Sequence, residues 1–309
     1  MADAPADNPC AACARPAYIG CSVQQGIEGQ ETMSINPIRR VGMIGLGKMG
    51  LPMARHLREH GFEVTAYDIN PSACASAGKL GIKVAATAKA VAADSDFVIV
   101  VVGFDGEVER VVASSDGIIA ANRPGLILGI ASTIAPQTML RLAAKVAEAD
   151  IKIIDMPLTR GESAAEAGNL LVMLGGDSDV IAVCEPVLKS FAGAIFHLGE
   201  VGSAQVGKMV NNLILWACIS ANHEGLKIAR QLGVDTERLR SALLASSASN
   251  WALEMRPEEQ PMPWAEKDMR ILMTEADRAR VSLPLCGVVA EVVKTIKYEH
   301  GWPTPHISE

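Results

Sequence analysis

Two polar residues, Lys208 and Asn212, stand four positions apart in an otherwise apolar stretch of the chain. On a helix this spacing places both side chains on one face. Burial among apolar neighbours lowers the pKa of a lysine, so its amine can act as a general acid or base. The alternative is a surface lysine whose ammonium reaches water from an apolar helix. The amide one turn away, which can hold the ammonium or a substrate, favours the catalytic interpretation.

A serine and a threonine, Ser132 and Thr133, follow an apolar segment that has the length of a strand. They come just before Pro136, where a helix is predicted to begin. Hydroxyl side chains at such a place either cap the helix or bind a ligand at the end of the strand. Their position leaves both interpretations open.

A loop after another apolar segment contains Thr159, Arg160 and Gly161. The guanidinium of Arg160 can bind a carboxylate or a similar anion through two parallel hydrogen bonds. The alternative is a loop charge surrounded by water. Arg160 is therefore a candidate for recognition of an anionic substrate.

A lysine and an aspartate, Lys267 and Asp268, open a predicted helix nearer the C-terminus. The aspartate suits the positive end of the helix dipole, whereas the lysine does not. A cation at this unfavourable position indicates a bound ligand.

The chain also carries a glycine motif in which an apolar run enters G-x-G-x-x-G at Gly45, Gly47 and Gly50. The first glycine allows a tight turn, the second lets a pyrophosphate approach the backbone, and the third lets the next helix pack closely. The free N–H groups at the helix N-terminus then face the phosphates. The loop is completed by Leu46, Lys48 and Met49.

An acidic residue, Asp68, ends the next predicted strand at 62–67 and lies 18 residues beyond Gly50. This is where a Rossmann unit places the acid that binds the adenosine ribose hydroxyls. No arginine follows it directly, and a carboxylate repels a 2′-phosphate, so NAD is favoured over NADP. The alternative is a glycine turn in another α/β fold, with Asp68 capping the following helix.

These residues must be positioned by a mostly parallel, doubly wound sheet, because short apolar strands alternate with helical segments up to about residue 198. Strands are expected at 41–45, 63–67, 82–84, 97–102, 126–130, 151–154, 170–174 and 194–197. The later pattern is helical, at 203–232, 235–246, 264–279 and 284–298. The predicted fold class is α/β, with a flexible leader at 1–37, a Rossmann-type NAD-binding domain at 38–200 and an all-α substrate and dimerisation domain at 201–309, joined by the long interdomain helix.

The composition narrows the class of protein. Of 309 residues, 49% are hydrophobic and 20% charged, which suits a large core, and the net charge of −7 argues against nucleic-acid binding. No apolar run is long enough to cross a bilayer, so no membrane partner is expected. The six histidines show no metal-binding spacing, and Ser132 has neither a histidine partner nor a nucleophile elbow, so neither a metal site nor hydrolase chemistry is expected.

The seven cysteines mostly stand alone in apolar stretches, as expected for reduced thiols in the cytoplasm. Cys10, Cys13 and Cys21 resemble a metal or redox spacing, but no second ligand pair completes it. They fall in the leader, which lacks a secretion signal. Met33 is our hypothesis for the native start.

The motifs together resemble those of the β-hydroxyacid dehydrogenases, the relatives of 3-hydroxyisobutyrate dehydrogenase and tartronate semialdehyde reductase. The matching segments, in the order seen in that family, are 44–54, 132–134, 155–157, 168–176, 208–212 and 267–268. The resemblance covers about residues 39–298. It implies hydride transfer between a nicotinamide cofactor and a small β-hydroxy acid, and a helical second domain like that of 6-phosphogluconate dehydrogenase.

The resemblance also implies roles for single residues. Lys208 resembles the lysine that protonates the substrate carbonyl, Asn212 the residue that orients the substrate, and Ser132 the loop residue that touches substrate and nicotinamide. Contacts with the cofactor are expected from Val102, Gly103, Thr133 and Lys267, in addition to the glycine loop and Asp68.

One segment departs from the family pattern. Many members have Ser-Gly-Gly where this chain has Thr159, Arg160 and Gly161, and an arginine here is similar to the sulfolactaldehyde reductase-like branch. We expect Arg160 to meet an anionic head group. The Pro-rich segment between Ser247 and Lys267 also looks shorter than in many members.

Two alternatives stay open, an imine or amine reductase of the same superfamily and a non-catalytic protein-binding relative. Retention of Lys208 and the acidic composition favour the dehydrogenase. The long helix is too apolar for one buried stripe, so a homodimer or homotetramer is expected.

Overall fold

The computed structural model of the protein describes residues 37–256, 258 and 260–303. The predicted leader lies outside these described residues except for Pro37, and so do Met33 and the three N-terminal cysteines. In the part of the chain that the structure describes, no helix is both long and apolar enough to cross a bilayer.

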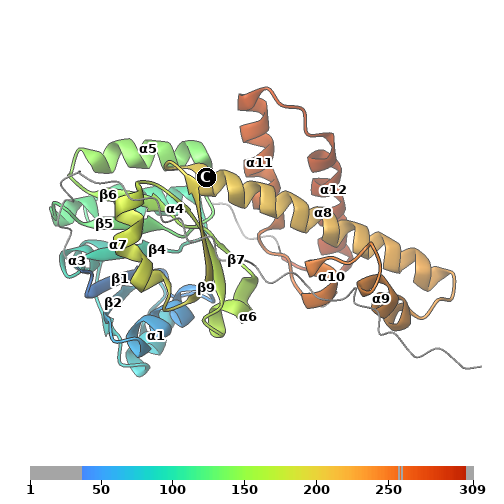
Figure 1. The fold of residues 1–309 in the computed structure, drawn as a ribbon, viewed down its shortest axis with the longest axis horizontal. Helices are drawn as coiled ribbons and strands as arrows, with labels where there is room; N and C mark the ends of the chain where they lie inside the picture. The colour runs from blue at the N-terminus through green and yellow to red at the C-terminus, as the bar shows by residue number, and fades with distance from the viewer. Residues whose placement is uncertain (1–36, 257, 259, 304–309) are drawn as a thin grey trace, which may run out of the picture. The chain divides into compact units, whose positions relative to one another are not determined.

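A nine-stranded sheet forms the first half of the described chain, with strand order β3-β2-β1-β4-β5-β6-β8-β7 and β9 paired to β8 (Figure 1). The strands from β1 to β6 run parallel, β8 is antiparallel to β6 and β7, and β9 is parallel to β8. The strands are β1 (Arg40–Ile44), β2 (Glu63–Tyr67), β3 (Lys83–Val84), β4 (Phe97–Val100), β5 (Ile127–Ile130), β6 (Lys152–Asp155), β7 (Leu158–Thr159), β8 (Leu170–Gly175) and β9 (Ala192–Gly199).

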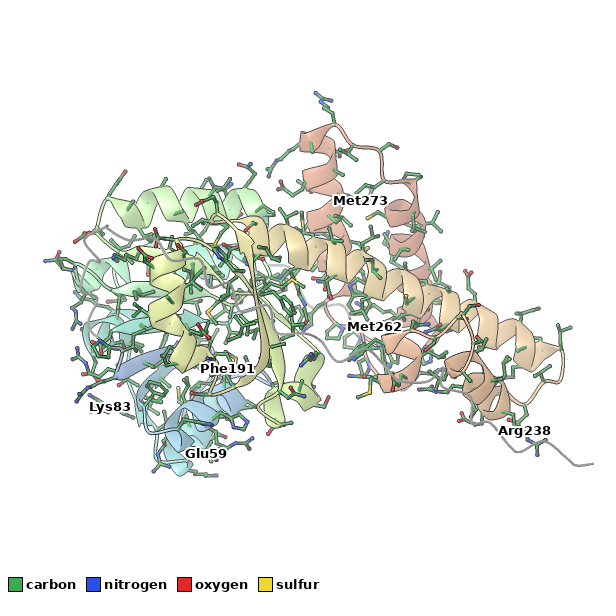
Figure 2. The ribbon with its side chains drawn as sticks, in the orientation of Figure 1. Glu59, Lys83, Phe191, Arg238, Met262 and Met273 are labelled. Carbon is green, nitrogen blue, oxygen red and sulfur yellow. The ribbon has the colours of Figure 1, made fainter. Side chains whose placement is uncertain are left out.

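The central strands β4 and β5 are buried on both faces, which explains their continuous apolar runs. Along β4, Phe97 and Ile99 pack into one hydrophobic cluster, while the alternating Val98 and Val100 pack into the other. Phe191, labelled in Figure 2, belongs to the first cluster. The helices between the strands are α1 (Gly50–Glu59), α2 (Pro71–Lys79), α3 (Ala88–Ala93), α4 (Asp105–Ala113), α5 (Pro136–Ala147), α6 (Gly161–Glu166) and α7 (Ser178–Leu188).

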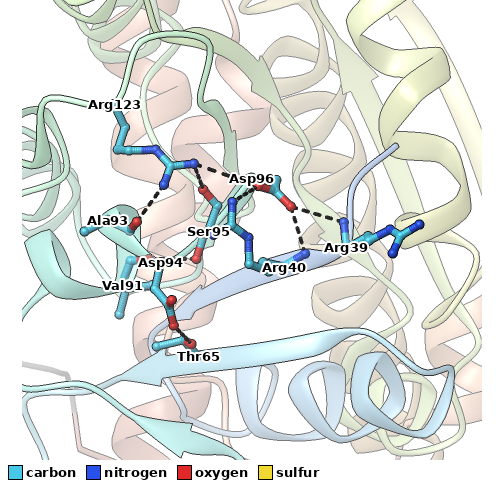
Figure 3. Close-up of polar contacts among 9 residues, drawn as sticks. All are labelled: Arg39, Arg40, Thr65, Val91, Ala93, Asp94, Ser95, Asp96 and Arg123. Carbon is cyan, nitrogen blue, oxygen red and sulfur yellow. Dashed lines mark hydrogen bonds and ion pairs between the residues drawn. The ribbon is translucent and has the colours of Figure 1, made fainter. Parts of the chain in front are cut away.

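The amino ends of β1 and β4 are tied together by Asp96 (Figure 3). Its carboxylate accepts hydrogen bonds from the backbone N–H groups of Arg39 and Arg40, at 3.2 and 3.0 Å, and pairs with the Arg40 guanidinium. Because β1 and β4 are parallel neighbours, this contact fixes the two strands whose opposite, carboxyl ends lead into the glycine loop and into Val102.

The second half of the described chain is helical and is built on one long helix, α8 (Ser203–Gln231) (Figure 1). Its end is set by Gly233, whose φ of 77° stops the helix. The remaining helices are α9 (Thr236–Leu244), α10 (Trp251–Met255), α11 (Ala265–Ala279) and α12 (Pro284–Glu299). Helices α10, α11 and α12 pack against α8 around a third cluster that includes Trp216, Met262 and Met269.

The predicted fold class, a Rossmann-type sheet followed by an all-α domain, is confirmed by this architecture. Several short elements were not predicted. The expected loop at residues 159–161 instead ends strand β7 and begins helix α6, and a 3-10 helix lies at Ile119–Ala121. Strand β7 is two residues long, too short for a periodic pattern. Helix α10 has five residues and depends on a cap, in which the Asn250 side chain accepts a hydrogen bond from the Leu253 N–H at 2.9 Å.

Candidate active site

The glycine loop is joined directly to the acid at the end of β2. The Leu46 N–H donates to Asp68 Oδ2 at 2.6 Å, and the Asn70 N–H donates to Asp68 Oδ1 at 2.7 Å. Asn70, not Asp68, caps α2, through a bond from the Ser72 N–H. The alternative in which Asp68 is a helix cap is therefore wrong, and the carboxylate lies against the loop that follows β1.

The spacing of the three glycines matches what a dinucleotide requires. A Cβ on Gly50 would overlap the Gly45 carbonyl oxygen, and a Cβ on Gly45 would overlap the Val101 carbonyl oxygen at a backbone φ of +95°. A Cβ on Gly47 would meet no atom within 4 Å. The first and third glycines thus hold helix to strand, while the space beside the second is open, as the close approach of a pyrophosphate to the backbone would require. Of the other loop residues, Leu46 is buried, Met49 packs on the core and the exposed Lys48 pairs with Glu162.

The loops after β4 and β5 are linked by Ser132. Its hydroxyl accepts a hydrogen bond from the Val102 N–H at 2.8 Å, and its carbonyl accepts one from Gln205 Nε2 on α8 at 2.9 Å. Ala135, not Ser132, is the N-cap of α5, and no side chain caps that helix. The cap interpretation of Ser132 is wrong, and the residue connects the loops after β4 and β5 to the long helix.

The N-terminus of α8 is fixed to the sheet by Asp155 at the end of β6. Its two carboxylate oxygens accept hydrogen bonds from the N–H groups of Gly202 and Gln205, at 2.8 and 2.9 Å. The side chain is fully buried, and this burial raises the pKa of the carboxyl group. Asp155 thereby sets where the first turns of α8 meet the sheet.

Lys208 lies two turns into α8, and its Nζ donates to the carbonyl oxygen of Leu158 on β7 at 2.7 Å. The alternative interpretation, in which the Lys208 ammonium extends from the helix into water, is therefore wrong. Burial lowers the pKa of Lys208, with a smaller lowering from Lys267, while Asp268 opposes the shift. Asn212 is buried one turn later, and its Oδ1 accepts a hydrogen bond from Asn211 Nδ2 at 3.0 Å.

Lys267 on α11 reaches from the helical domain to the loops after β4 and β5. Its Nζ donates to the carbonyl oxygens of Gly103 and Thr133, each at 2.5 Å. It also lies 5.6 Å from the ring centroid of Phe104 and 5.8 Å from that of Trp264. Burial lowers the pKa of this lysine as well. The predicted cofactor residues Gly103 and Thr133 are thus brought together by Lys267.

Asp268 is a further candidate site residue, for which the sequence pattern indicated only a favourable position at the helix N-terminus. Its carboxylate is 7% exposed and accepts a hydrogen bond from Trp216 Nε1 at 3.0 Å. Burial raises the pKa of Asp268, and Lys208, Lys267, Trp216 and Asn212 all oppose that rise. The repeated spacing of four between Lys208, Asn212 and Trp216 was the signal that these residues share a face with a common partner.

Arg160 lies at the end of β7 in the left-handed conformation, with a φ of 79°. Its Nη1 donates to both the carbonyl and the Oδ1 of Asn169, at 3.2 Å. Thr159 pairs with Leu171 in the sheet, and Gly161 begins α6 with a φ of 75°. The guanidinium of Arg160 therefore contacts Asn169 in this structure. Binding of a substrate anion by Arg160 stays a prediction.

A cavity of about 460 Å³ lies away from these residues, between the second half of α8 and the end of α12. Its charged groups pair with one another, in Lys227–Glu299 at 2.6 Å and Arg230–Glu258 at 3.0 Å. It contains none of the predicted site residues. Within the described residues, no group of three His, Cys, Asp or Glu side chains is arranged to hold a metal ion.

Two family models match nearly the whole described chain. Residues 40–199 match the NAD binding domain of 6-phosphogluconate dehydrogenase, and residues 202–306 match the NAD-binding domain of NADP-dependent 3-hydroxyisobutyrate dehydrogenase. The boundary between the matches falls where β9 ends and α8 begins.

Individual relatives give the same result. The chain is 31% identical to a 3-hydroxyisobutyrate dehydrogenase of Pseudomonas aeruginosa, over 79% of this chain and 88% of that protein. It is also 31% identical to an NAD-dependent L-serine dehydrogenase of the same organism, over 71% of this chain and 73% of the relative.

A solved structure, that of Mycobacterium tuberculosis 3-hydroxyisobutyrate dehydrogenase with L-serine, superposes with a TM-score of 0.75 at 25% identity, over 86% of this chain and 96% of that one. The family resemblance predicted from the motifs is confirmed. The chain belongs to the β-hydroxyacid dehydrogenase family and is an NAD(P)-dependent hydroxyacid dehydrogenase.

Proposed function

We propose that the protein interconverts a small β-hydroxy acid and its semialdehyde, with Lys208 as the general acid and base. The observation that carries this proposal is the half-buried Lys208 side chain, whose amine is held by the Leu158 carbonyl one turn from the buried Asn212. When bound, the nicotinamide group donates or accepts the hydride. The residues proposed to hold the cofactor are the glycine loop 45–50, Asp68, Val102, Gly103, Thr133 and Lys267.

The protein's own contribution is orientation and one proton. In reduction, the Lys208 ammonium gives its proton to the substrate carbonyl oxygen, and in oxidation the neutral amine takes the proton from the alcohol. Asn212 orients the substrate through its amide. Ser132 holds the loop against which substrate and cofactor lie, because its hydroxyl is already bonded to the Val102 N–H.

We propose NAD as the preferred cofactor. Support comes from Asp68, whose carboxylate is held beside the glycine loop by the N–H groups of Leu46 and Asn70. A negative charge at this point accepts hydrogen bonds from ribose hydroxyls and repels a 2′-phosphate.

For the substrate, we propose a small acid with an anionic head group, of the 3-hydroxyisobutyrate, tartronate semialdehyde, succinic semialdehyde or sulfolactaldehyde type. The two Pseudomonas relatives are named for 3-hydroxyisobutyrate and L-serine, both β-hydroxy acids. Thr159, Arg160 and Gly161 supply the nearby polar groups, and Arg160 needs only to leave Asn169 to offer a free guanidinium.

The test is a panel of small hydroxy acids and semialdehydes with carboxylate or sulfonate heads, assayed with NAD and NADH beside a cyclic imine. We expect turnover of at least one β-hydroxy acid, and loss of turnover with retained NADH binding in Lys208→Ala. Lys145→Ala, at an exposed lysine of α5, is the matched control. Full activity of Lys208→Ala, or faster reduction of the imine than of any aldehyde, would refute the proposal.

We also propose that the protein is a homodimer or homotetramer in the cytoplasm. On α8, the exposed side chains of Val206, Val210 and Ile214 repeat every four residues and form an apolar stripe. The cysteines of the described chain, Cys74, Cys184, Cys218 and Cys286, are all unpaired thiols, as in a reducing compartment. Light scattering on the protein as it leaves a size-exclusion column measures the mass of the assembly. A mass equal to that of one chain would contradict the proposal.

A further inference from the structure

Three side chains on successive turns of α8 share one face, Lys208, Asn212 and Trp216. The third is 6% exposed, and its indole N–H donates to Asp268 Oδ2 on α11 at 3.0 Å. The side chain of Asn212 also bonds to Asp268, and Lys208 is close enough to affect the charge on that carboxylate. One buried carboxylate is therefore bonded to Trp216 and lies within electrostatic reach of Lys208 on the same helix face.

An indole N–H can only donate, so it stabilises the ionised form of Asp268 more than the protonated form. This matters because a buried carboxylate without donors takes up a proton. An ionised Asp268 in turn stabilises the Lys208 ammonium, which is the form needed to protonate a carbonyl.

The ring of Trp216 is itself fixed. The guanidinium of Arg256 lies 5.9 Å from its centroid and donates to the backbone carbonyls of Gln260 and Pro261. A rigid ring delivers its N–H at one place, so the carboxylate that accepts it is held at one place as well.

We propose that Trp216 is a positioning residue for hydride transfer, because its indole N–H holds the Asp268 carboxylate in place and in its ionised form. The proposal rests on the proposed role of Lys208 as the acid and base. Trp216 makes no contact with the reacting atoms in this scheme and acts only through Asp268.

Several charged groups surround the pair formed by Trp216 and Asp268 on the packed helices. They are Lys208 on α8, Lys267 on α11, Arg256 after α10, and Lys297 on α12, which pairs with Glu266 at 2.8 Å. Replacing the indole nitrogen by sulfur removes one donor to Asp268 and leaves these charged side chains in the sequence unchanged.

The experiment replaces Trp216 with benzothienylalanine, which keeps the ring shape but has sulfur in place of the N–H, and in parallel with Phe. The Asp268 carboxyl is titrated by carbon-13 NMR with labelled aspartate, assigned with Asp268→Asn. We expect its pKa to rise by about one unit, since one charge-assisted hydrogen bond is lost. The apparent pKa of the acid limb in the pH profile of reduction should rise by the same amount. We expect kcat to fall about tenfold and KM for NADH to stay unchanged.

The matched control is Ile219→Ala, which removes a buried apolar side chain from the same helix and cluster. It should lower Tm and leave both the titration and the acid limb where they are. An unchanged Asp268 titration in the benzothienylalanine protein overturns the proposal whether or not the enzyme turns over, and so does a shifted titration with an unchanged rate profile. Failure of the proposed function shows separately, as full activity of Lys208→Ala.

Discussion

Lys208 Nζ lies 2.7 Å from the carbonyl oxygen of Leu158, so the proposed acid and base on α8 is bonded to the short strand β7. The carbonyl accepts a hydrogen bond from the amine without supplying a counter-charge. The lysine is thus held in position while burial still lowers its pKa. Orientation by a neutral group is what a residue needs if it must both release and accept a proton.

The lowered pKa of Lys208 gives a pH dependence with a definite sign. Oxidation requires the neutral amine, so kcat/KM for oxidation should rise with pH through an apparent pKa below the ordinary lysine value. Reduction requires the ammonium and should fall through the same pKa. Initial rates in both directions across neutral to alkaline pH check this, and a flat oxidation profile would exclude Lys208 as the base. Lys208→Arg should abolish the profile, because arginine stays protonated.

The carboxylate of Asp68 should set the cofactor preference. Asp68→Ser removes the charge and shortens the side chain that accepts the Leu46 N–H. We expect NADH affinity to fall about tenfold or more, the effect of losing a charged hydrogen bond, and NADPH affinity to improve relative to it. Fluorescence titration of both cofactors measures the change. Binding of NADPH by the unaltered protein at least as tightly as NADH would contradict the assignment.

Helix α1 packs too closely on the glycine loop to accept a side chain at Gly50. Gly50→Ala would place its Cβ against the Gly45 carbonyl oxygen, so the loop must move. We expect a loss of about 1–3 kcal/mol in the free energy of unfolding and loss of cofactor binding. Gly78→Ala on α2 is the control, since a Cβ there meets nothing within 4 Å, and it should stabilise by up to about 1 kcal/mol. Equal behaviour of the two variants in urea unfolding would refute the close packing.

Arg160 should act on substrate affinity alone. Arg160→Gly suits the backbone φ of 79° and removes a guanidinium bonded to Asn169. If this guanidinium binds the substrate anion, KM for anionic substrates should rise by the equivalent of about 1.5–3 kcal/mol, with NADH binding unchanged. Asn169→Ala removes the Oδ1 acceptor but keeps the backbone carbonyl that Arg160 also contacts, and it serves as the comparison. Unaltered KM in Arg160→Gly would leave the residue as a sheet-edge contact.

Asp155 should be needed for the placement of α8. Asp155→Asn replaces one of two accepting oxygens with an NH₂ group, which cannot accept from the Gly202 or Gln205 N–H. We expect about 2 kcal/mol lower stability and a lower kcat, because the first turns of α8 carry the site lysine. Thermal and urea unfolding give the first quantity and initial rates the second. A variant that is destabilised but has full kcat would show that α8 stays in place without this contact.

Most of the fold was predictable because it is encoded in local patterns. Strands β1 and β4 are each visible as a short apolar run, and the glycine loop between β1 and α1 is visible from the spacing of three glycines. Each of these patterns spans only a few consecutive residues. The length of α8 follows from a continuous helical pattern that ends at Gly233. The two-residue strand β7 was not predictable, since it exists only because Leu158 and Thr159 pair with the distant strand β8.

The sequence by itself determined which residues could do chemistry, namely the Gly45–Gly50 loop, Asp68 and the face shared by Lys208 and Asn212. These depend on spacing along one strand or one helix. Only the tertiary structure decided that Asp68 bonds to the glycine loop and does not cap α2. It also decided that Ser132 links two loops instead of capping a helix, and that Asp268 accepts a hydrogen bond from Trp216. Each of these is a hydrogen bond between segments 22 to 52 residues apart in the chain. The partner of a buried polar group is chosen by packing between elements, which local pattern does not specify.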